Sequence, residues 1–487
     1  MSAIVHIDNL AVAYGQTPVL QQLSWTIERG SHYVLAGTSG SGKSTLAKAI
    51  ARLISSSGTI TYAFDTESPL LPKAIYVSNW YQFTNLEGDR NFYYQQRYNR
   101  HQGQDTLTVR AELLHFAKSN GLDLGTVQDK MDAMGFAHTM DSQLIELSSG
   151  EHKKLQLVKA LWQKPQLLLI DEPFTGLDTQ SRYALNDWLD ELAEEGVQLV
   201  LITNDHILPA AMNRYAHISN GKLEVVPALA DIPQDALRQA KDLPAFLMEE
   251  PQTDFDSIAD LRNIVVRYGE KVVLKDVSWQ IAVGDKWLLQ GPNGSGKSTL
   301  LSLINGDHPQ SYGLDITLFG KKRGSGESIW DIKEKIGMIS PEMHWYFDQQ
   351  ATVWHTLASG FYDSIGWFID VKFQERKQIE DLMAFFDLTE HKDQLLHTLP
   401  LGKQRLAMLA RSIIKNPPLL VLDEPCQGLD AQQARYFNAV VDELCRHGKT
   451  LIYVGHYESQ LPQCIEKRII LEKGEVVALE NKVENVL

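Results

Sequence analysis

The sequence contains the same set of motifs twice, in the same order. The segment GTSGSGKST begins at Gly37, and GPNGSGKST begins at Gly291, 254 residues later. A tyrosine precedes each of these segments at the same spacing of 254 residues. Further along, LLLIDEPFTGLD ends at Asp178 and LLVLDEPCQGLD ends at Asp430, 252 residues apart. Three motifs repeated at nearly constant spacing indicate two copies of one domain.

The repeat sets the expected domain boundaries. Copy 1 is predicted at residues 1–225, copy 2 at 258–487, and a linker at 226–257. The linker is acidic, is rich in proline, and contains one candidate short helix at 236–240. A chain of 487 residues accommodates two such domains, each with a sizeable core.

Short apolar runs alternate with helical segments in both copies. The runs favour buried strands, and their alternation with helices predicts an α/β fold with a mainly parallel sheet. The Asn220–Gly221 pair between two strand-like runs predicts a hairpin. The predicted buried strands are at 33–37, 167–170 and 198–203 in copy 1, and at 286–291, 419–422 and 451–455 in copy 2.

The glycine-rich segments match the GxxxxGK[ST] phosphate-binding loop. Glycines let the backbone N–H groups converge on phosphate oxygens, and the helix that follows favours an anion at its N-terminus. We expect Lys43 and Lys297 to reach the β- and γ-phosphates, and Ser44 and Ser298 to offer hydroxyls to Mg²⁺. The predicted nucleotide-binding residues are Gly37, Thr38, Ser39, Gly40, Ser41, Gly42, Lys43, Ser44 and Thr45 in copy 1, and Gly291, Pro292, Asn293, Gly294, Ser295, Gly296, Lys297, Ser298 and Thr299 in copy 2.

An acidic pair follows a predicted buried strand in each copy. Asp171 and Asp423 are predicted Mg²⁺ ligands, because this cation prefers oxygen ligands. Glu172 and Glu424 come one residue later and are predicted to orient or deprotonate the attacking water.

These motifs, together with LSSGE at 147–151 before a helical segment, resemble the ATP-binding-cassette ATPases. The resemblance implies two P-loop NTPase domains, each a RecA-like core with a helical subdomain, that bind ATP and Mg²⁺. It also implies that Ser148 and Gly150 contact the γ-phosphate of nucleotide held by the other copy. By the same resemblance Tyr14 and Tyr268 stack on adenine; the alternative is that they are core tyrosines.

The two copies depart from each other at two family motifs. Copy 2 has Pro400 where copy 1 has Ser148, and proline has neither a hydroxyl nor an N–H; it is also a comfortable residue at a helix start. His456 matches the family's switch histidine, whereas Asn204 holds that position in copy 1, unless the register moves to His206. Asparagine donates a hydrogen bond but cannot carry a proton to the phosphate.

The family's head-to-tail pairing would place both departures in one composite site. That site would combine Lys43, Asp171, Glu172 and Asn204 with the LPLGK segment at 399–403. The other site would combine Lys297, Asp423, Glu424 and His456 with LSSGE. We therefore expect the second site to hydrolyse ATP and the first to turn over slowly, within a chain that works as a monomer.

A third departure concerns coupling to a permease. The family has a glutamine after a strand, near the transporter contact. Copy 1 has Asn79 there, with Gln82 as a substitute, and copy 2 has Pro341 followed by Glu342. The sequence leaves open which residue takes the glutamine's place.

Composition narrows the choice of partner. The net charge of −15 argues against a general nucleic-acid binder, and no apolar stretch is long enough to cross a membrane. No signal peptide is visible, and the three cysteines do not form a metal or disulfide pattern. We expect a cytoplasmic protein or one held peripherally on the inner face of the cell membrane.

Three partners fit the same ATPase chemistry. The segment 306–337 resembles a subgroup of tandem cassettes named for molybdenum transport, which implies a membrane permease for molybdate or a related oxyanion. A ribosome-associated cassette protein is the second alternative, but its kind carries a long basic linker, and this linker is short and acidic. A tandem sugar-importer ATPase is the third. A non-hydrolysing, nucleotide-gated adaptor is the alternative outside enzymes.

Overall fold

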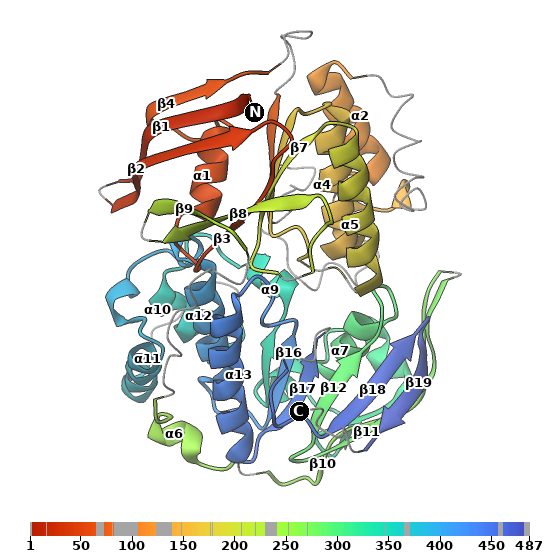
Figure 1. Ribbon diagram of the computed structural model, residues 1–487. Helices are drawn as coiled ribbons and strands as arrows, with labels where there is room; N and C mark the ends of the chain where they lie inside the picture. Colours follow the sequence, from red (N-terminus) through yellow and green to blue (C-terminus); the bar gives the residue numbers. More distant parts are fainter. Residues whose placement is uncertain are drawn as a thin grey trace. The chain divides into compact units, whose positions relative to one another are not determined.

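A computed structural model gives the structure of the chain (Figure 1). Two compact units are present, and each is described by itself: unit 1 holds the described residues up to 228, and unit 2 those from 241 onward. The described residues are 2–15, 17–64, 73–79, 81, 106–122, 139–147, 149–175, 177, 179–205, 207–219, 221–228, 241–251, 253–269, 271–345, 347–364, 371–455 and 461–481.

Unit 1 contains a three-stranded antiparallel sheet in the order β2-β1-β4 and a six-stranded sheet in the order β5-β6-β7-β3-β8-β9. The six-stranded sheet is parallel except for β9, which forms the predicted hairpin with β8. The elements of unit 1 are β1 (Ala3–Tyr14), β2 (Thr17–Glu28), β3 (His32–Ala36), α1 (Lys43–Ile50), β4 (Ser57–Tyr62), β5 (Ala74–Val77), α2 (Val109–Asn120), η4 (Leu144–Glu146), α4 (Ser149–Trp162), β6 (Leu167–Asp171), α5 (Thr179–Glu194), β7 (Gln198–Ile202), β8 (Met212–Ser219) and β9 (Lys222–Val226).

Unit 2 repeats this plan with sheets in the orders β11-β10-β13-β14 and β15-β16-β17-β12-β18-β19. Its elements are α6 (Ala245–Met248), β10 (Ser257–Tyr268), β11 (Lys271–Ala282), β12 (Lys286–Gln290), α7 (Lys297–Ile304), η6 (Pro309–Gly313), β13 (Asp315–Leu318), β14 (Lys321–Lys322), α8 (Ile329–Lys333), β15 (Ile336–Ile339), α9 (Pro341–Trp345), α10 (Val353–Ser359), α11 (Phe373–Phe385), η7 (Thr389–His391), η8 (Leu396–Thr398), α12 (Leu401–Ile413), β16 (Leu419–Asp423), α13 (Ala431–Arg446), β17 (Thr450–Val454), β18 (Lys467–Glu472) and β19 (Glu475–Glu480).

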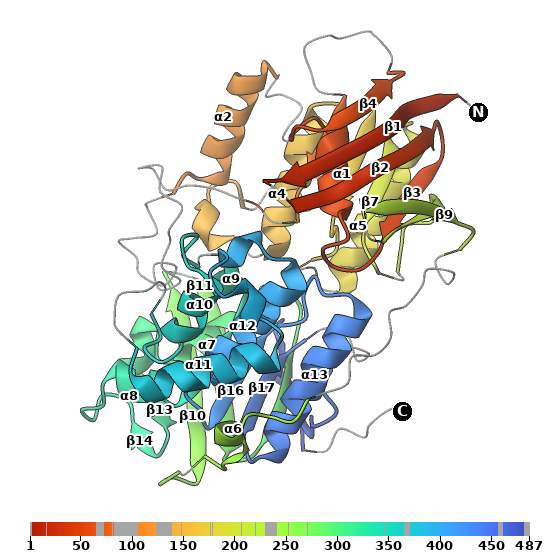
Figure 2. The same cartoon turned by 90° about the vertical axis from the view of Figure 1, so that its left-hand side faces the viewer.

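One helix in each unit is packed between its two sheets. In unit 1, α1 lies behind β1, β2 and β4 (Figure 2), and Leu46 and Ile50 of this helix share a buried cluster with both sheets. In unit 2, Leu300 and Ile304 of α7 occupy the same place. Because the glycine-rich loop leads into this helix, the packing fixes the loop at the carboxyl end of the preceding strand. The predicted α/β fold with a mainly parallel sheet is confirmed.

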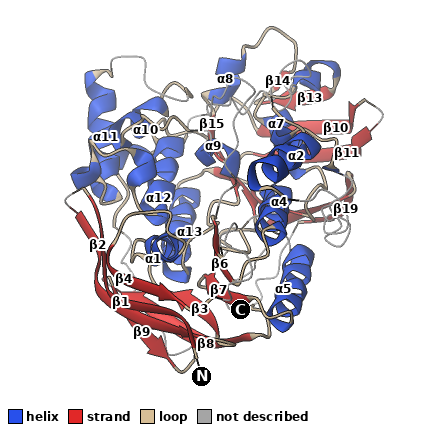
Figure 3. Ribbon diagram, turned by 90° about the horizontal axis from the view of Figure 1, so that it is seen from above, coloured by secondary structure: helices blue, strands red, loops and turns tan. Residues whose placement is uncertain are grey.

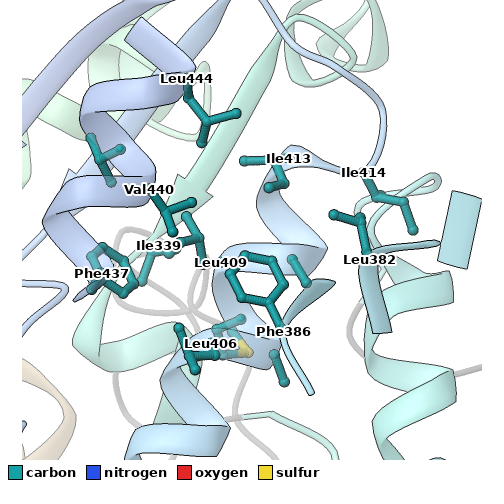
Figure 4. Close-up of a cluster of buried hydrophobic side chains, with 14 of the residues drawn as sticks. Ile339, Leu382, Phe386, Leu406, Leu409, Ile413, Ile414, Phe437, Val440 and Leu444 are labelled. Atoms are coloured by element: carbon teal, nitrogen blue, oxygen red, sulfur yellow. The ribbon is translucent and has the colours of Figure 1, made fainter. Parts of the chain in front are cut away.

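The helical part of unit 2 shares its core with the sheet. Helices α10, α11, α12 and α13 gather on one side of the unit (Figure 3), and their apolar side chains meet those of β15. Figure 4 shows Phe386 beside Leu409, and Leu382 facing Ile414. Burying such side chains stabilises the unit by about 1.5–3 kcal/mol each, an upper estimate. In the described part of unit 1, the cluster of α2 and α4 is separate from the sheet clusters.

Part of the predicted linker packs on unit 2. Leu243 precedes the short helix α6 and Leu247 lies within it. These side chains are 4% and 0% exposed and belong to the hydrophobic core formed by α10–α13. The candidate helix at 236–240 lies outside the described residues. The boundary at 258 stays a prediction.

Candidate nucleotide-binding sites

The two glycine-rich loops adopt the same backbone course. Gly37 and Gly42 have φ angles of 143° and 106°, and Gly291 and Gly296 have 149° and 104°. A Cβ atom on Gly37 would lie 2.3 Å from the carbonyl oxygen of Ile218, so only glycine fits there. Helices α1 and α7 then begin without a side-chain cap, which leaves their first N–H groups available to an anion.

Each loop carries polar groups that suit a phosphate. Lys43 Nζ donates to the carbonyl oxygens of the first two residues of its loop at 2.6 and 2.9 Å, and Lys297 does the same at 2.8 and 3.1 Å. The hydroxyls of Ser41 and Ser295, the fifth residue of each loop, are buried and have no hydrogen-bond partner among the described residues. Buried polar atoms normally have partners, and phosphate oxygens would supply them here.

The acidic pairs stand where sequence predicted them, with an unusual backbone. Strands β6 and β16 end at Asp171 and Asp423, which are 6% and 7% exposed. Glu172 and Glu424 follow with φ angles of 44° and 45°, in the left-handed region. Each donates its N–H to the last carbonyl of the neighbouring strand, at 2.9 and 3.1 Å. A glutamate held in this conformation costs about 1–2 kcal/mol, a kind of strain that gathers at functional sites.

Tyr76 of β5 touches both predicted metal ligands of unit 1. Its hydroxyl donates to Asp171 Oδ2 at 2.7 Å and lies beside the side chain of Ser44. Burial and the Asp171 charge raise the pKa of Tyr76 far above its ordinary value, so it remains a donor. Since one hydroxyl reaches both groups, the carboxylate and the serine are close enough to share a small cation, and this donor set fits Mg²⁺.

Unit 2 has no hydroxyl at the position of Tyr76. Met338 is its counterpart, because Tyr76 pairs with the residue two before Asp171 and Met338 pairs with the residue two before Asp423. The Met338 sulfur instead accepts from Asn305 Nδ2 at 3.1 Å.

A buried lysine lies behind the acidic pair of unit 1. Lys153 of α4 is 2% exposed, and its Nζ donates to the carbonyl oxygens of Asp171 at 2.9 Å and Ser78 at 3.1 Å. Burial lowers the pKa of Lys153 to about 8, against the opposing charges of Asp171 and Glu172. Burial and then the Asp171 charge raise the pKa of Glu172 above its ordinary value. Lys153 therefore ties α4 to the end of β6 and to the segment after β5.

Unit 2 has an arginine at the corresponding position, 252 residues later. Arg405 of α12 is fully buried; its Nη2 donates to the Gln427 carbonyl at 3.4 Å, and its Nε and Nη1 meet no acceptor in the described part of the chain. Burial lowers the pKa of Arg405 to about 10. The Gln427 side chain donates to Glu424 Oε2 at 3.0 Å, whereas Thr175 stands at this position in unit 1.

Asn204 binds the phosphate loop of unit 1 directly. Its Oδ1 accepts from the Gly37 N–H at 3.0 Å, and its Nδ2 donates to the Gly37 carbonyl at 3.1 Å. Both ends of the amide thus act on the first residue of the loop. His206 and His456 lie outside the described residues.

The two predicted adenine-stacking tyrosines end the first strand of each unit. Tyr14 and Tyr268 are 52% and 37% exposed, so neither is a core residue. The hairpins that carry them lie against the phosphate loops: a Cβ atom on Gly42 would lie 2.6 Å from Leu20, and one on Gly296 would lie 2.7 Å from Leu274. Each tyrosine is therefore carried by a hairpin that packs on a loop that suits phosphate.

Comparison with known proteins identifies the family. A family model described as "ABC transporter" matches residues 20–175 and 274–427. The chain belongs to the ABC transporter family. It is a tandem ATP-binding protein that hydrolyses ATP, and we refer to units 1 and 2 as cassettes 1 and 2.

Two relatives match nearly the whole chain. The ABC transporter ATP-binding protein ModF of Escherichia coli strain K12 is 34% identical, over 93% of this chain and 94% of its own length. An uncharacterized ABC transporter ATP-binding protein of Schizosaccharomyces pombe is 30% identical, over 98% and 99%. A solved archaeal ribosome recycling factor, aABCE1 bound to the stalk protein aP1, matches 97% of this chain and 90% of its own with a TM-score of 0.55 and 16% identity, which shows the fold alone.

The signature segments of the cassettes differ as the sequence indicated. Gly150 is buried in the first turn of α4, and Ser148 lies outside the described residues. Pro400 is the N-cap of α12 with φ −55°, at a helix start, where proline's missing N–H does no harm. How the signatures complete the sites stays a prediction.

The segments that replace the family's glutamine also differ. Asn79 follows β5, and its Oδ1 is buried with no hydrogen-bond donor near it among the residues that the structure describes. Pro341 opens helix α9. Gln82 and the side chain of Glu342 lie outside the described residues, so the choice between these substitutes stays open. No helix among the described residues is both long and apolar enough to cross a bilayer.

Sequence reasoning missed Tyr76, Lys153, Arg405 and Gln427. Gln427 lies inside the recognised DEPCQG motif, and its difference from Thr175 was visible in the repeat. Lys153 and Arg405 could have been found as basic residues at the same repeat position, 252 residues apart, in the helices α4 and α12. Tyr76 gave no such signal, since its partner Asp171 is 95 residues away.

Proposed function

We propose that this ATPase energises a membrane transporter, acting at the inner face of the cell membrane with an oxyanion of the molybdate class as cargo. The similarity to the E. coli ABC transporter ATP-binding protein over nearly the full length of both chains supports the transporter role. The resemblance of residues 306–337 to tandem cassettes named for molybdenum transport supports the cargo. Cassette boundaries at 225 and 258 belong to the same proposal.

We propose the following chemistry for the two cassettes. Loop N–H groups, Lys43 and Lys297 bind the phosphates, while Tyr14 and Tyr268 stack on the adenine. Mg²⁺, held by Asp171 with Ser44 or by Asp423 with Ser298, would neutralise phosphate charge as the γ-phosphate leaves. Glu424 orients the attacking water and takes its proton.

We further propose that cassette 2 carries most of the turnover. Glu424 is oriented by Gln427 at 3.0 Å, which is the observation that favours this cassette. In cassette 1, Tyr76 occupies one Asp171 oxygen, and Asn204 is bonded to the loop at both ends of its amide. Its residues suit retention of ATP better than rapid hydrolysis.

The transporter proposal is tested by trapping the ATP-bound state. Glu424→Gln should slow hydrolysis and hold the closed form, so the tagged variant is purified from its own cells with ATP and its companions are identified. Lys297→Ala, which weakens nucleotide binding, is the matched control. Recovery of an integral membrane permease only with Glu424→Gln supports the proposal. Recovery of ribosomal proteins, or of neither, overturns it.

The cargo has a separate test. Cells lacking the chain should take up labelled molybdate more slowly, and the wild-type chain should restore the rate while Glu424→Gln does not. Unchanged molybdate uptake in the deletion strain would rule out this cargo.

A further inference from the structure

The adenine-side tyrosine of cassette 2 is held by a histidine. Tyr268 Oη lies 2.8 Å from His308 Nε2, and the two ring centroids are 5.8 Å apart at 61°. Tyr268 is 37% exposed, whereas His308 is 1% exposed. The tyrosine side chain is thus partly exposed to solvent, while its hydroxyl is held by a buried group.

The tautomer of His308 follows from its other contact. The backbone N–H of Gln310 donates to His308 Nδ1 at 3.2 Å, so Nδ1 is an acceptor. A neutral imidazole then carries its proton on Nε2, and this proton is donated to Tyr268 Oη. Burial lowers the pKa of His308 to about 4, which keeps the ring neutral near pH 7.

His308 also connects the tyrosine to the phosphate-loop helix. Its backbone N–H donates to the carbonyl of Ser302 in α7 at 3.1 Å. Gln310 reinforces the link, because its Nε2 donates to the Arg267 carbonyl at 2.7 Å and its Oε1 accepts from the Arg267 N–H at 3.4 Å. The helix that opens at the phosphate loop and the strand end that carries Tyr268 are therefore bonded through one segment.

Cassette 1 lacks this link. The spacing of 254 residues aligns Ile54 with His308, and isoleucine has no polar atom to offer. The side chain of Tyr14 makes no hydrogen bond with the described residues and is 52% exposed. The two tyrosines thus have equivalent positions in the fold, but only Tyr268 has a histidine that holds its hydroxyl.

We propose that His308, positioned by Gln310, fixes Tyr268 as a preformed base platform at a set distance from the phosphate loop of cassette 2. The ligand class is a purine nucleoside triphosphate, whose base and phosphates are bound at once. His308 is a positioning residue, since it acts through the tyrosine. The inference rests on the proposed stacking of Tyr268 on adenine. Preorganisation reduces the ordering cost of binding, so the effect appears in affinity.

The test compares a nucleotide with a ligand that has no base. All variants carry Lys43→Ala, so that calorimetry reports cassette 2, and dissociation constants are measured for ATP and for inorganic tripolyphosphate. His308→Asn keeps a side-chain acceptor for the Gln310 N–H but cannot reach Tyr268. Tyr268→Phe keeps the ring and removes the hydroxyl. Each should weaken ATP binding about three- to tenfold and leave tripolyphosphate within about twofold.

The double variant should bind ATP no more weakly than either single variant, because both remove the same bond. Unchanged ATP affinity in His308→Asn, or an equal loss for tripolyphosphate, overturns the proposal. Tyr268→Ala separates it from the stacking on which it rests. If Tyr268→Ala leaves ATP affinity unchanged, the stacking is wrong; if only Tyr268→Ala weakens it, stacking holds and the anchor is wrong.

Discussion

The two cassettes share their motifs and differ in what surrounds them. In cassette 1, two residues of the predicted reaction centre form hydrogen bonds with other residues of that cassette. Asp171 accepts from Tyr76, and Asn204 binds Gly37. In cassette 2 a neighbour, Gln427, orients the predicted base Glu424. Two sites with the same phosphate-loop and DEP motifs thus differ in the neighbours of their acidic residues, and we propose that these neighbours favour retention of nucleotide in cassette 1 and hydrolysis in cassette 2.

The largest expected difference lies in the two glutamates. Glu424→Gln should lower kcat about 100-fold or more, because it removes the proposed base of the working site, while Glu172→Gln should lower kcat less than about threefold. Steady-state phosphate release by the purified full chain measures both. Equal losses of kcat would break the comparison between the cassettes.

The stability contributed by the buried basic residue of each cassette, Lys153 in cassette 1 and Arg405 in cassette 2, should depend differently on pH. The folded-state pKa of Lys153 is about 8, below its unfolded value, so the unfolded chain binds more protons above pH 8 and stability rises with pH there. For Arg405, with a pKa of about 10, the same rise begins only near pH 10.

Wild type should therefore gain about 1.5 kcal/mol over Lys153→Met between pH 8 and 9.5, and nothing comparable over Arg405→Met. Urea unfolding of the full chain, followed by tryptophan fluorescence, gives these differences. A gain over Lys153→Met that stayed flat across this range would show that the lysine is not buried as described.

The hydrogen bonds between Asn204 and the phosphate loop should affect the affinity of cassette 1 for ATP. Asn204→Ala removes two hydrogen bonds from Gly37, so ATP affinity of cassette 1 should fall about tenfold. Calorimetry in a Lys297→Ala background isolates this cassette. Unchanged affinity would mean that the loop keeps its course without the amide.

The contact between Gln427 and Glu424 should give the smallest effect. Gln427→Thr copies the residue of cassette 1 and should lower kcat about fivefold, since the base loses an orienting donor. The reverse exchange, Thr175→Gln, is the matched control and should leave kcat within about twofold. A larger change from Thr175→Gln than from Gln427→Thr would reverse the assignment.

The sequence predicted the features that are encoded by short, local patterns of residues. The loops, the strands that precede them and the acidic pairs are each determined by a few consecutive residues, and they stand where the motifs placed them. The neighbours were not predicted, because Tyr76 meets Asp171 across 95 residues and Lys153 meets Ser78 across 75. Such contacts depend on strand order and helix packing, which a single sequence does not specify.

The difference at position 204 shows a middle case. The repeat spacing places Asn204 at the position of the family's switch histidine, with His206 as the alternative, and the chemistry of asparagine excludes proton transfer. That its amide binds Gly37, 167 residues away, required the packing of β7 beside β3. Residue identity predicted what the side chain cannot do, and the fold revealed what it does.

The left-handed backbone at Glu172 and Glu424 bears on laboratory evolution. Glycine at either position would relax the chain by about 1 kcal/mol while deleting the carboxylate. A screen that selects only for heat resistance should therefore enrich glycine at these two positions. Adding a selection for ATP turnover should eliminate the change at 424 and still permit it at 172, so the pattern of surviving clones would itself report which cassette does the work.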